Sequence, residues 1–443
     1  MKLSQSASGI LSARYRVVLI LCALANSALT SASAQAAPSV TDPFFNIPGV
    51  TNPFLNMPTF KSLLIQDLKD SKVYINPVVE QAAEILDLDY EYLIKLTDNQ
   101  QDAFDRVDDL LYELDEAPKK QYQVLREVAP DLSKSGIHVA SNIAKSIINA
   151  TSARFNASTV PQFPSYQNYY RRGLYGRSGG EYNAESGSVW VQGLFNHAEK
   201  SGKESFSANS AGFAAGVEAC SPDGFKAGIG YSFAATSIDT DRSQNDAKTH
   251  TAFVYAGFQP ENFYANFFGG FGHSSYDDTT KTAKLESEYQ INTVSTQIAV
   301  GYSAPVLSPE IAFRFIGSHE KAYTDALGVE FESKNSTAAT AIGGFKLSNR
   351  YRLRSAKATS FIPELKAAVT YDFARSTPNK TAFLPNGSSY IVETDTDKRL
   401  GAEASAGFSL NFKGSGSLAV MYDGAFQGRL QSHSIALNVK IYL

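Results

Sequence analysis

Cysteine is scarce in this chain, which has two in 443 residues, Cys22 and Cys220. Cys22 lies in an apolar run near the N-terminus, which we interpret as part of a signal peptide that is removed on export. Cys220 would then be the single cysteine of the exported protein, so we expect neither an intramolecular disulfide nor a zinc site built on a cysteine pair. The fold must be stabilised by other means.

An excess of charge of one sign is also absent. The 40 Lys and Arg residues nearly balance the 44 Asp and Glu residues, and the basic residues are scattered, so the composition does not indicate nucleic-acid binding. Beyond the N-terminal region no apolar run approaches the roughly 20 residues of a membrane-spanning helix. A membrane protein built from helices is therefore not expected.

Catalytic signatures are missing as well. The sequence has no H-E-x-x-H or phosphate-binding G-x-x-x-x-G-K-[ST] pattern, and its G-x-S-x-G match, "GRSGG" at 176–180, lies in a stretch rich in Pro, Gly and Tyr, where no strand-turn-helix elbow is expected. The stretch "FFGGFGHSSYDD" combines His273 with Asp277 and Asp278, but a Gly-rich strand followed by a polar loop explains it. We expect no enzyme, no cofactor and no metal. Histidines are dispersed along the chain, at His138, His197, His250, His273, His319 and His433.

The N-terminus has the order of a secretory signal. Basic residues between Lys2 and Arg16 precede the apolar run "VVLILCALANSAL", and the small residues "TSASAQAA" follow it. This order predicts a signal peptide over residues 1–36, with cleavage after Ala34 or Ala36. The alternative, a permanent anchor helix, would need a longer run. Export across an inner membrane is expected.

Residues 37–60 contain a short repeat, "TDPFFNIPGV" followed by "TNPFLNMPTF". Its prolines exclude a helix and disrupt a sheet. A stiff, exposed arm is the simplest interpretation, and a docking peptide that presents Phe44 and Phe54 to a partner is the alternative.

Residues 61–130 form an acidic region with apolar residues at helical spacing, which predicts several short helices separated at Pro118 and Pro130. The acidic face is interpreted as solvated, although a cation or partner site is an alternative. Residues 131–187 comprise one further helix, rich in small residues, and then a linker rich in Pro, Gly and Tyr that leads into or through the next domain.

From residue 188 onward the sequence reads as strands separated by turns. Short joins such as 221–224 and 259–262 alternate with long polar stretches such as 239–247 and 376–397, as in membrane barrels. We therefore predict an all-β transmembrane barrel of about twelve antiparallel strands over 188–443, preceded by a small α-helical N-terminal region; a soluble two-sheet protein is the alternative. The twelve segments are 188–199, 206–219, 224–238, 248–259, 262–275, 286–303, 310–320, 337–348, 360–373, 398–412, 416–424 and 432–443.

The last segment, "HSIALNVKIYL", alternates strictly between apolar and polar residues and ends at Leu443 without a tail. A closed ring removes the unpaired edges that lipid does not tolerate, so we expect this strand to pair with the first one, "SVWVQGLF". The residues expected on the lipid side are Phe253, Tyr255, Phe313, Phe315, Ile435, Leu437, Val439, Ile441 and Leu443.

At these residues the chain resembles the β-domains of type V secretion autotransporters of Gram-negative bacteria. The first strand of that family is similar to the segment around Trp190 and Gly193, and "SGIHVASNIAKSIINATSARF" resembles the helix that precedes such barrels. The family usually ends in Phe or Trp, where this chain has Leu443. The most specific match is the closing pattern, formed here by Tyr422, Asp423, Gly424, Phe426 and His433, followed by Ile435, Leu437, Val439, Ile441 and Leu443.

The resemblance implies an outer-membrane location, insertion by the barrel-assembly machinery, and a helix in the lumen whose small residues Ser141, Ala144 and Ala150 ease the fit. It also implies that the N-terminal passenger is displayed at the cell surface, as an adhesin-like module for a host or surface ligand that the sequence does not identify. The alternative is a porin-like or envelope-structural barrel whose helices stay periplasmic or plug the lumen.

The resemblance also bears on cleavage of the passenger. Some relatives cut themselves at an Asn in the lumen, and Asn142, Asn149 and Asn156 lie in or beside the corresponding helix. The sequence has no Asn-Asn pair there, so the passenger is expected to stay attached. The expected partners are outer-membrane lipid and the assembly machinery, and not nucleic acid.

Overall fold

A computed structural model of the chain describes fifteen stretches of it, and all of them belong to the second of two compact units, 1–57 and 58–443. The predicted signal peptide, 1–36, and the proline-rich arm, 37–60, lie outside the described residues. The acidic region that follows, 61–130, is described in part. The described residues are 65–66, 68–70, 96–114, 117–129, 135–156, 187–202, 205–221, 224–259, 262–304, 307–353, 358–376, 379–385, 387–392, 398–412 and 416–443.

Ahead of the strands, the described part of the chain has short helical stretches at 65–66 and 68–70 and three longer helices, α5 (Asp98–Glu113), α6 (Pro118–Val128) and α7 (Ser135–Asn156). The side chain of Thr97 caps α5 by accepting from the backbone N–H of Gln100, and the side chain of Gln100 returns the bond. Pro118 begins α6 at a position where its missing N–H costs nothing. The predicted break at Pro118 is therefore confirmed.

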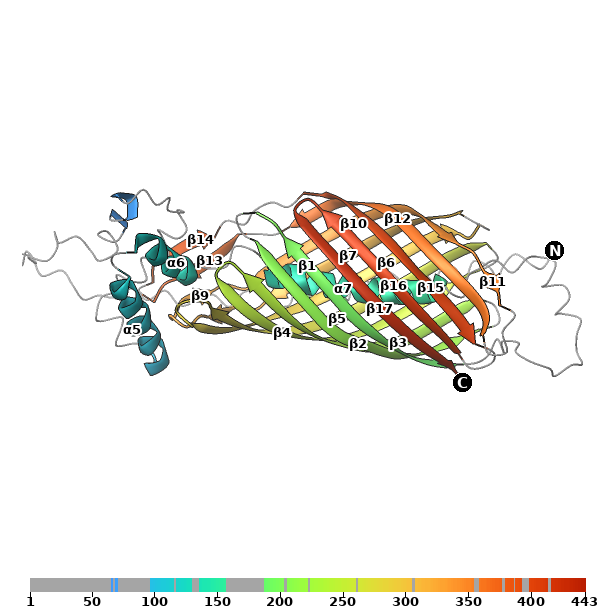
Figure 1. The fold of residues 1–443 in the computed structure, drawn as a ribbon, viewed down its shortest axis with the longest axis horizontal. Helices are drawn as coiled ribbons and strands as arrows, with labels where there is room; N and C mark the ends of the chain where they lie inside the picture. Colours follow the sequence, from blue (N-terminus) through green and yellow to red (C-terminus); the bar gives the residue numbers. More distant parts are fainter. Residues whose placement is uncertain are drawn as a thin grey trace, which may run out of the picture. The chain divides into compact units, whose positions relative to one another are not determined.

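A ring of antiparallel strands follows the helices (Figure 1). Consecutive strands pair with one another, β10 pairs with β12, and β1 pairs with β17 to complete the circle. Twelve strands form this ring, so the predicted fold class is confirmed. They are β1 (Ser188–Lys200), β2 (Phe206–Cys220), β3 (Phe225–Thr240), β4 (Ser243–Phe258), β5 (Phe263–Thr280), β6 (Glu286–Tyr302), β7 (Leu307–Glu320), β10 (Lys334–Ser348), β12 (Ala358–Ser376), β15 (Leu400–Phe412), β16 (Gly416–Gln427) and β17 (Leu430–Tyr442).

The connections differ between the two rims of the ring. One rim holds the start of β1, the end of β17 and the connections from β2 to β3 and from β4 to β5; we call it the short-turn rim. The other, the long-loop rim, holds the connections from β7 to β10 and from β12 to β15. These two connections contain β8 (Tyr323–Thr324), β9 (Glu330–Phe331), β13 (Lys380–Phe383) and β14 (Ser389–Val392), which form a second sheet in the order β14-β13-β9-β8.

One predicted long loop is wrong. Residues 239–247 are mostly strand, because β3 runs to Thr240, β4 begins at Ser243, and only Asp241 and Arg242 turn between them. The stretch reads as a loop because polar residues occupy both of its faces. A barrel strand needs an apolar face only where it meets hydrocarbon, and the ladder of hydrogen bonds continues above that level. The small β11 (Tyr351–Arg352) pairs with β12 outside the ring.

Side chains alternate between the outward face and the lumen along each strand. The outward prediction holds for Phe313 and for the residues from Ile435 to Leu443, all of which are exposed, and Phe315 is partly exposed on the same face. It is wrong for Phe253 and Tyr255, which are 4% and 2% exposed and face the lumen, while Val254 faces outward. Both faces of "AFVYAGF" are apolar, so periodicity alone could not assign its direction.

Helix α7 runs inside the ring (Figure 1) and contacts β1 through β7 and β17. Its first turn lies at the long-loop rim, where the hydroxyl of Tyr276, near the end of β5, donates to the carbonyl of Gly136 at 2.9 Å. Helices α5 and α6 lie at the same rim. They share one apolar core with residues of the connections at this rim, including Leu285 between β5 and β6, Leu327 between β8 and β9, and Leu384 between β13 and β14.

Candidate functional site

The seam between β1 and β17 closes the ring. The two strands pair without a break from Ser188 opposite Tyr442 to Lys200 opposite Leu430, and Leu443 adds a backbone bond to Gly187 at 2.9 Å. The apolar residues predicted to carry the assembly signal all face outward on β17; they are Ile435, Leu437, Val439, Ile441 and Leu443. The strand therefore presents a continuous apolar surface, and its role in assembly stays a prediction.

The closing pattern on β16 sits directly beside this surface. Gly424 lies opposite His433, the hydroxyl of Tyr422 is 2.7 Å from Nδ1 of His433, and the ring of Phe426 meets the imidazole edge-on at 5.6 Å between centroids. Asp423 lies on the opposite face of β16, where the hydroxyl of Ser405 donates to its carboxylate at 2.6 Å. The pattern thus combines one aromatic cluster outside with one polar contact inside.

On the inner side of the seam, Trp190 is 2% exposed and its indole N–H donates to the hydroxyl of Tyr255 at 2.8 Å. Tyr255 in turn donates to Glu218, whose carboxylate also pairs with Lys440 of the last strand. These contacts join β1, β2, β4 and β17 through buried polar groups that are all satisfied by one another. The sequence analysis identified Trp190, assigned Tyr255 wrongly to the lipid side and missed Glu218 and Lys440, since the spacing of these residues along the chain carries no signal.

Glycines make room for this packing. A Cβ on Gly216, which lies opposite Trp190 on β2, would stand 2.7 Å from the indole ring and 2.5 Å from the carbonyl oxygen of Ile229. No side chain fits there without displacing the indole. The predicted Gly193 is different, because a Cβ there would meet only an ordinary contact with Phe195 at 3.9 Å. Gly216, not Gly193, is the position where the seam requires glycine.

The lumen has an apolar wall where α7 packs. The predicted small residues Ala144 and Ala150 are buried on α7, and Ser141 is partly buried. Larger residues contribute more to the packing, with Ile147 and Ile148 almost completely buried. Their partners are on β1 through β6; those buried in the same core include Trp190, Leu194, Phe206, Ile238, Phe253, Phe268, Tyr276 and Ile291.

A charged wall lines the rest of the lumen. Arg314 of β7 pairs in a bidentate manner with Glu403 of β15, at 2.6 and 3.3 Å, and donates to Gln297 at 2.8 Å. Lys366 of β12 pairs with Glu310 of β7 at 2.7 Å. Each pair joins strands that are not neighbours in the ring. A buried charge needs a close partner of opposite sign, and these residues satisfy that need across the lumen.

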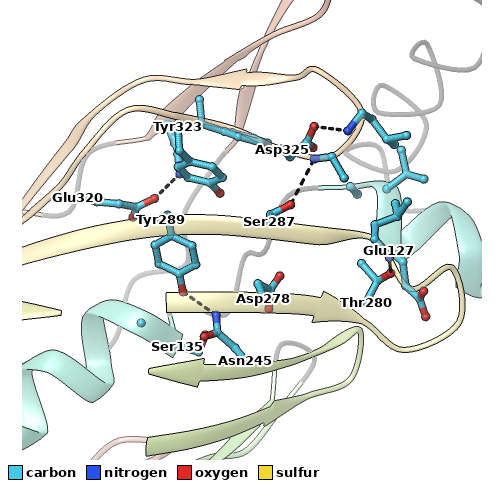
Figure 2. A pocket seen from close by; sticks show the side chains of 18 of the residues that line it. Glu127, Ser135, Asn245, Asp278, Thr280, Ser287, Tyr289, Glu320, Tyr323 and Asp325 are labelled. Carbon is cyan, nitrogen blue, oxygen red and sulfur yellow. Dashed lines mark hydrogen bonds and ion pairs between the residues drawn. The ribbon is translucent and has the colours of Figure 1, made fainter. Parts of the chain in front are cut away.

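A small pocket opens at the long-loop rim, between the first turn of α7 and the connections above it (Figure 2). Tyr276, Tyr289, Tyr323 and Phe331 form a continuous stack beside it, with centroid separations of 4.7, 5.4 and 4.9 Å. Lys380 lies over the ring of Tyr323 at 4.3 Å and pairs with Glu320. The side-chain amide of Asn245 donates to the hydroxyl of Tyr289 at 2.9 Å, as Figure 2 shows.

Asp325 lies above this pocket, in the turn between β8 and β9. Its carboxylate accepts from the backbone N–H groups of Leu327 and Val329, each at 2.9 Å. Burial raises the pKa of Asp325 to about 7, although these two bonds and the charge of Lys380 act in the opposite direction. The carboxyl group therefore changes protonation near neutral pH.

Helix α6 is fixed to the rim by polar contacts as well as by the apolar core. The carboxylate of Glu127 accepts from the backbone N–H groups of Thr282 and Ala283, at 2.8 and 3.0 Å, and from the hydroxyl of Thr282 at 2.8 Å. Arg242, in the turn from β3 to β4, donates to the carbonyl of Ala129 at 3.3 Å. The end of α6 is thus clamped to two connections of the ring.

Within the described part of the chain, no three His, Cys, Asp or Glu side chains are grouped so as to hold a metal ion. Among the same residues, no α-helix has the length and hydropathy to cross a bilayer.

Comparison with known proteins gives one family and a group of similar structures. The family model for the autotransporter beta-domain matches residues 189–423. The translocator domain of the autotransporter NalP from Neisseria meningitidis is 16% identical, with a TM-score of 0.48, over 67% of this chain and 98% of that one. The beta domain of the Bordetella autotransporter BrkA is 13% identical, with a TM-score of 0.44, over 58% and 99%.

The transport unit of the autotransporter AIDA-I from Escherichia coli is 12% identical, with a TM-score of 0.41, over 57% of this chain and 89% of that one. No curated protein matches the chain in sequence.

Proposed function

Since the chain belongs to the autotransporter β-domain family, we propose that its barrel translocates the short helical region ahead of it and holds that region, still attached, at the cell surface. The chain is an outer-membrane autotransporter barrel. The observation that carries the proposal is the path of α7, which fills the lumen and begins at the rim where α5 and α6 are bound.

The direction of the barrel supports surface display. An even number of antiparallel strands places the start of β1 and the end of β17 at the same rim, here the short-turn rim. Outer-membrane barrels have short periplasmic turns and longer extracellular loops. The long-loop rim is therefore assigned to the cell exterior, and α5 and α6, which share a core with its connections, lie there with it.

The residue ranges predicted from the sequence are kept in this proposal. Residues 1–36 act as the signal peptide, 37–60 as an exposed arm, 61–130 as the passenger region and 131–187 as the helix and linker that pass through the barrel formed by 188–443. An adhesin-like role for the arm and the acidic helices is consistent with α5, whose outer side carries acidic residues and Tyr112, 85% exposed.

Of the alternatives, retention of α5 and α6 in the periplasm is disfavoured by their contacts with the long-loop connections. A plugged lumen is instead compatible with display, because α7 packs against the apolar wall over most of its length. We therefore expect a barrel that conducts ions poorly. We assign insertion by the barrel-assembly machinery to the closing strand, whose outward face is apolar from Ile435 to its end.

The test is the accessibility of two thiols to a membrane-impermeant maleimide. Tyr112 on α5 is replaced by cysteine, and the native Cys220, at the short-turn end of β2, serves as the internal control. We expect position 112 to react on intact cells and Cys220 to react only after the outer membrane is permeabilised. Reaction of position 112 only after permeabilisation would favour the periplasmic alternative.

A further inference from the structure

Five of the chain's six histidines face outward from the barrel, although they are dispersed in the sequence. We call them the histidine belt. The sixth, His138, lies on α7 in the lumen, where its ring stacks on Phe206. The belt consists of His197 on β1, His250 on β4, His273 on β5, His319 on β7 and His433 on β17.

Each belt histidine stands where the apolar part of the outward face ends, on the side of the long-loop rim. On β1 the outward residues before His197 are apolar or glycine up to Phe195, and the next one is Glu199. On β17 the outward series from Leu443 to Ile435 is apolar, then come His433 and Gln431.

The other three strands repeat this order. On β4 the outward residues from Phe258 to Ala252 are apolar, and His250 is followed by Lys248. On β5, His273 follows Phe271, and on β7, His319 follows an outward series that ends in Phe315 and Gly317. The same residue type therefore marks the apolar boundary on five strands.

Ring closure brings these residues into register. His197 lies directly opposite His433, and His250 lies directly opposite His273. Asparagines extend the belt on the intervening strands, with Asn209 opposite His197, Asn292 opposite His273 and Asn335 opposite His319. The belt covers one side of the barrel. On β12 and β16 the outward face carries aromatic residues at this end instead, such as Phe373 and Phe426.

In each belt histidine, Nδ1 of the imidazole lies within hydrogen-bond distance of a side chain on the same face of the barrel. Asn209, Asn292 and Asn335 place their amide oxygens 2.9, 2.8 and 2.8 Å from Nδ1 of His197, His273 and His319. The hydroxyls of Tyr231 and Tyr422 lie 2.6 and 2.7 Å from Nδ1 of His250 and His433. These contacts fix the rings and leave Nε2 to face the surroundings, except that Nε2 of His197 lies 3.6 Å from Glu199.

The chemistry of Nε2 identifies the partner. The phenols of Tyr231 and Tyr422 can donate their O–H to Nδ1 of His250 and His433, which leaves the proton of these two rings on Nε2 to be donated outward. At the other three rings an amide oxygen accepts from Nδ1, so Nε2 is not the donor there. At the boundary of the hydrocarbon layer the strongest acceptors are the charged phosphate oxygens of lipid headgroups. The chain has one tryptophan, Trp190, and it faces the lumen, so of the two residue types that usually anchor this level of a membrane barrel only tyrosine is on the outside, where Tyr231 and Tyr422 hold two rings of the belt.

We propose that His250 and His433, the two belt histidines held by a phenol, donate from Nε2 to the phosphate groups of lipid headgroups in the leaflet at the long-loop rim. The belt thereby fixes the depth of the barrel on one side. This inference rests on the barrel's insertion in the membrane and is independent of what the passenger does.

The first test measures depth. In a Cys220→Ser background, a nitroxide is attached to single cysteines at position 195, 197 or 199 of β1, and its accessibility to oxygen and to a water-soluble nickel chelate is measured in liposomes. The nitroxide at position 195 should be more accessible to oxygen, and the nitroxide at position 199 more accessible to the nickel chelate. At position 197 the two accessibilities should be about equal. Oxygen-dominated accessibility at both 197 and 199 would place the belt inside the hydrocarbon and overturn the proposal.

The second test measures headgroup binding with a matched lipid pair, phosphatidic acid and diacylglycerol with the same acyl chains. Lipid retained by the detergent-solubilised barrel is counted by native mass spectrometry. His250→Ala with His433→Ala should lower the retention of phosphatidic acid by about tenfold, since a hydrogen bond to a charged group is of that strength. Retention of diacylglycerol should not change.

The matched control replaces two outward polar residues beyond the belt, Gln244→Ala and Gln431→Ala, and should retain both lipids like the unaltered chain. Heat-modifiable mobility on a gel shows whether each variant is folded. If the histidine variants fold and retain phosphatidic acid like the control, the belt does not bind phosphate. Loss of both lipids together would mean a general loss of apolar contact and would also overturn the proposal.

Discussion

The lumen has two walls that are built in different ways, one from the inward side chains of β1 through β6 and one from those of β7 through β15. The outward faces of these strands are similarly apolar. The wall of β1 through β6 is apolar and packs on α7, with Trp190, Phe253 and Ile291 among its buried residues. The wall of β7 through β15 carries ion pairs, of which Arg314 with Glu403 joins the first and last strands of this wall. One wall binds the helix, and the other braces the ring.

This difference separates two tasks. Apolar packing is not directional, so a helix can slide into place against it during translocation and then be held by the area it buries. Ion pairs require fixed geometry and join strands that do not neighbour each other, which opposes flattening of the ring. The ring should therefore keep its shape when the helix is loosened, while the helix cannot remain bound when the ring fails.

Opening the seam should have the largest effect, because both walls depend on it. Removal of Ile441, Tyr442 and Leu443, or Leu443→Asp, takes away outward apolar surface and, in the truncation, the last pairings with β1. We expect the loss of heat-modifiable barrel from the outer-membrane fraction, with synthesis and export unchanged. Leu443→Ile is the control and should assemble. Normal heat-modifiable mobility of the truncated chain would contradict the prediction.

Breaking the charged wall should come next. Arg314→Met leaves Glu403 buried without its bidentate partner, which typically costs about 4 kcal/mol. The measurement is the temperature at which the barrel loses its folded mobility, which should fall clearly. Arg314→Met combined with Glu403→Met should recover much of the loss, because no charge is then stranded.

Lys281→Met serves as the matched control for the charged wall, since its pair with Asp239 is exposed to solvent. Exposed pairs contribute about 0 to 1 kcal/mol, so this variant should unfold at nearly the unaltered temperature. If Arg314→Met behaved like Lys281→Met, the charged wall would not brace the ring.

Loosening the apolar wall should affect the helix and spare the ring. Ile147→Ala removes a side chain that is 1% exposed between α7 and the strands, which typically costs about 3 kcal/mol. We expect higher single-barrel conductance in a planar bilayer, with an unchanged unfolding temperature for the ring. Ser141→Ala, at a partly buried position on the same helix, should conduct like the unaltered chain. Equal conductance of the two variants would mean that Ile147 does not hold α7 in the lumen.

The contrast also explains what could be predicted from the sequence. The outward face repeats apolar residues wherever a strand meets hydrocarbon, so the series from Ile435 to Leu443 could be read directly. The inward face follows no such rule. Phe253 and Tyr255 were assigned to lipid because both faces of their segment are apolar, and the hydrogen bond from Trp190 that turns Tyr255 inward comes from 65 residues away.

Residues that meet only through ring closure could not be found by spacing. Arg314 and Glu403 are 89 positions apart, and Lys440 reaches Glu218 only because β17 and β2 flank β1. The same holds for the histidine belt, whose members look scattered until the strand register sets His197 beside His433. Polar stretches beyond the hydrocarbon, such as 239–247, were taken for loops because they lack the one pattern that lipid imposes.

The smallest predicted effect lies where the two walls meet, at the mouth of the lumen. The pKa of Asp325 is about 7, above its ordinary value of 3.8, so the folded turn binds the proton more tightly than the unfolded chain does. This contribution to stability is present below about pH 4 and is lost as the pH rises toward 7. A nitroxide at Glu330→Cys, an exposed position in β9, should therefore be more mobile at pH 8 than at pH 5. Asp325→Asn keeps an acceptor for Leu327 and Val329 but does not titrate, so it should give equal mobility at both pH values. A pH response that persists in this variant would contradict the assignment of the response to Asp325.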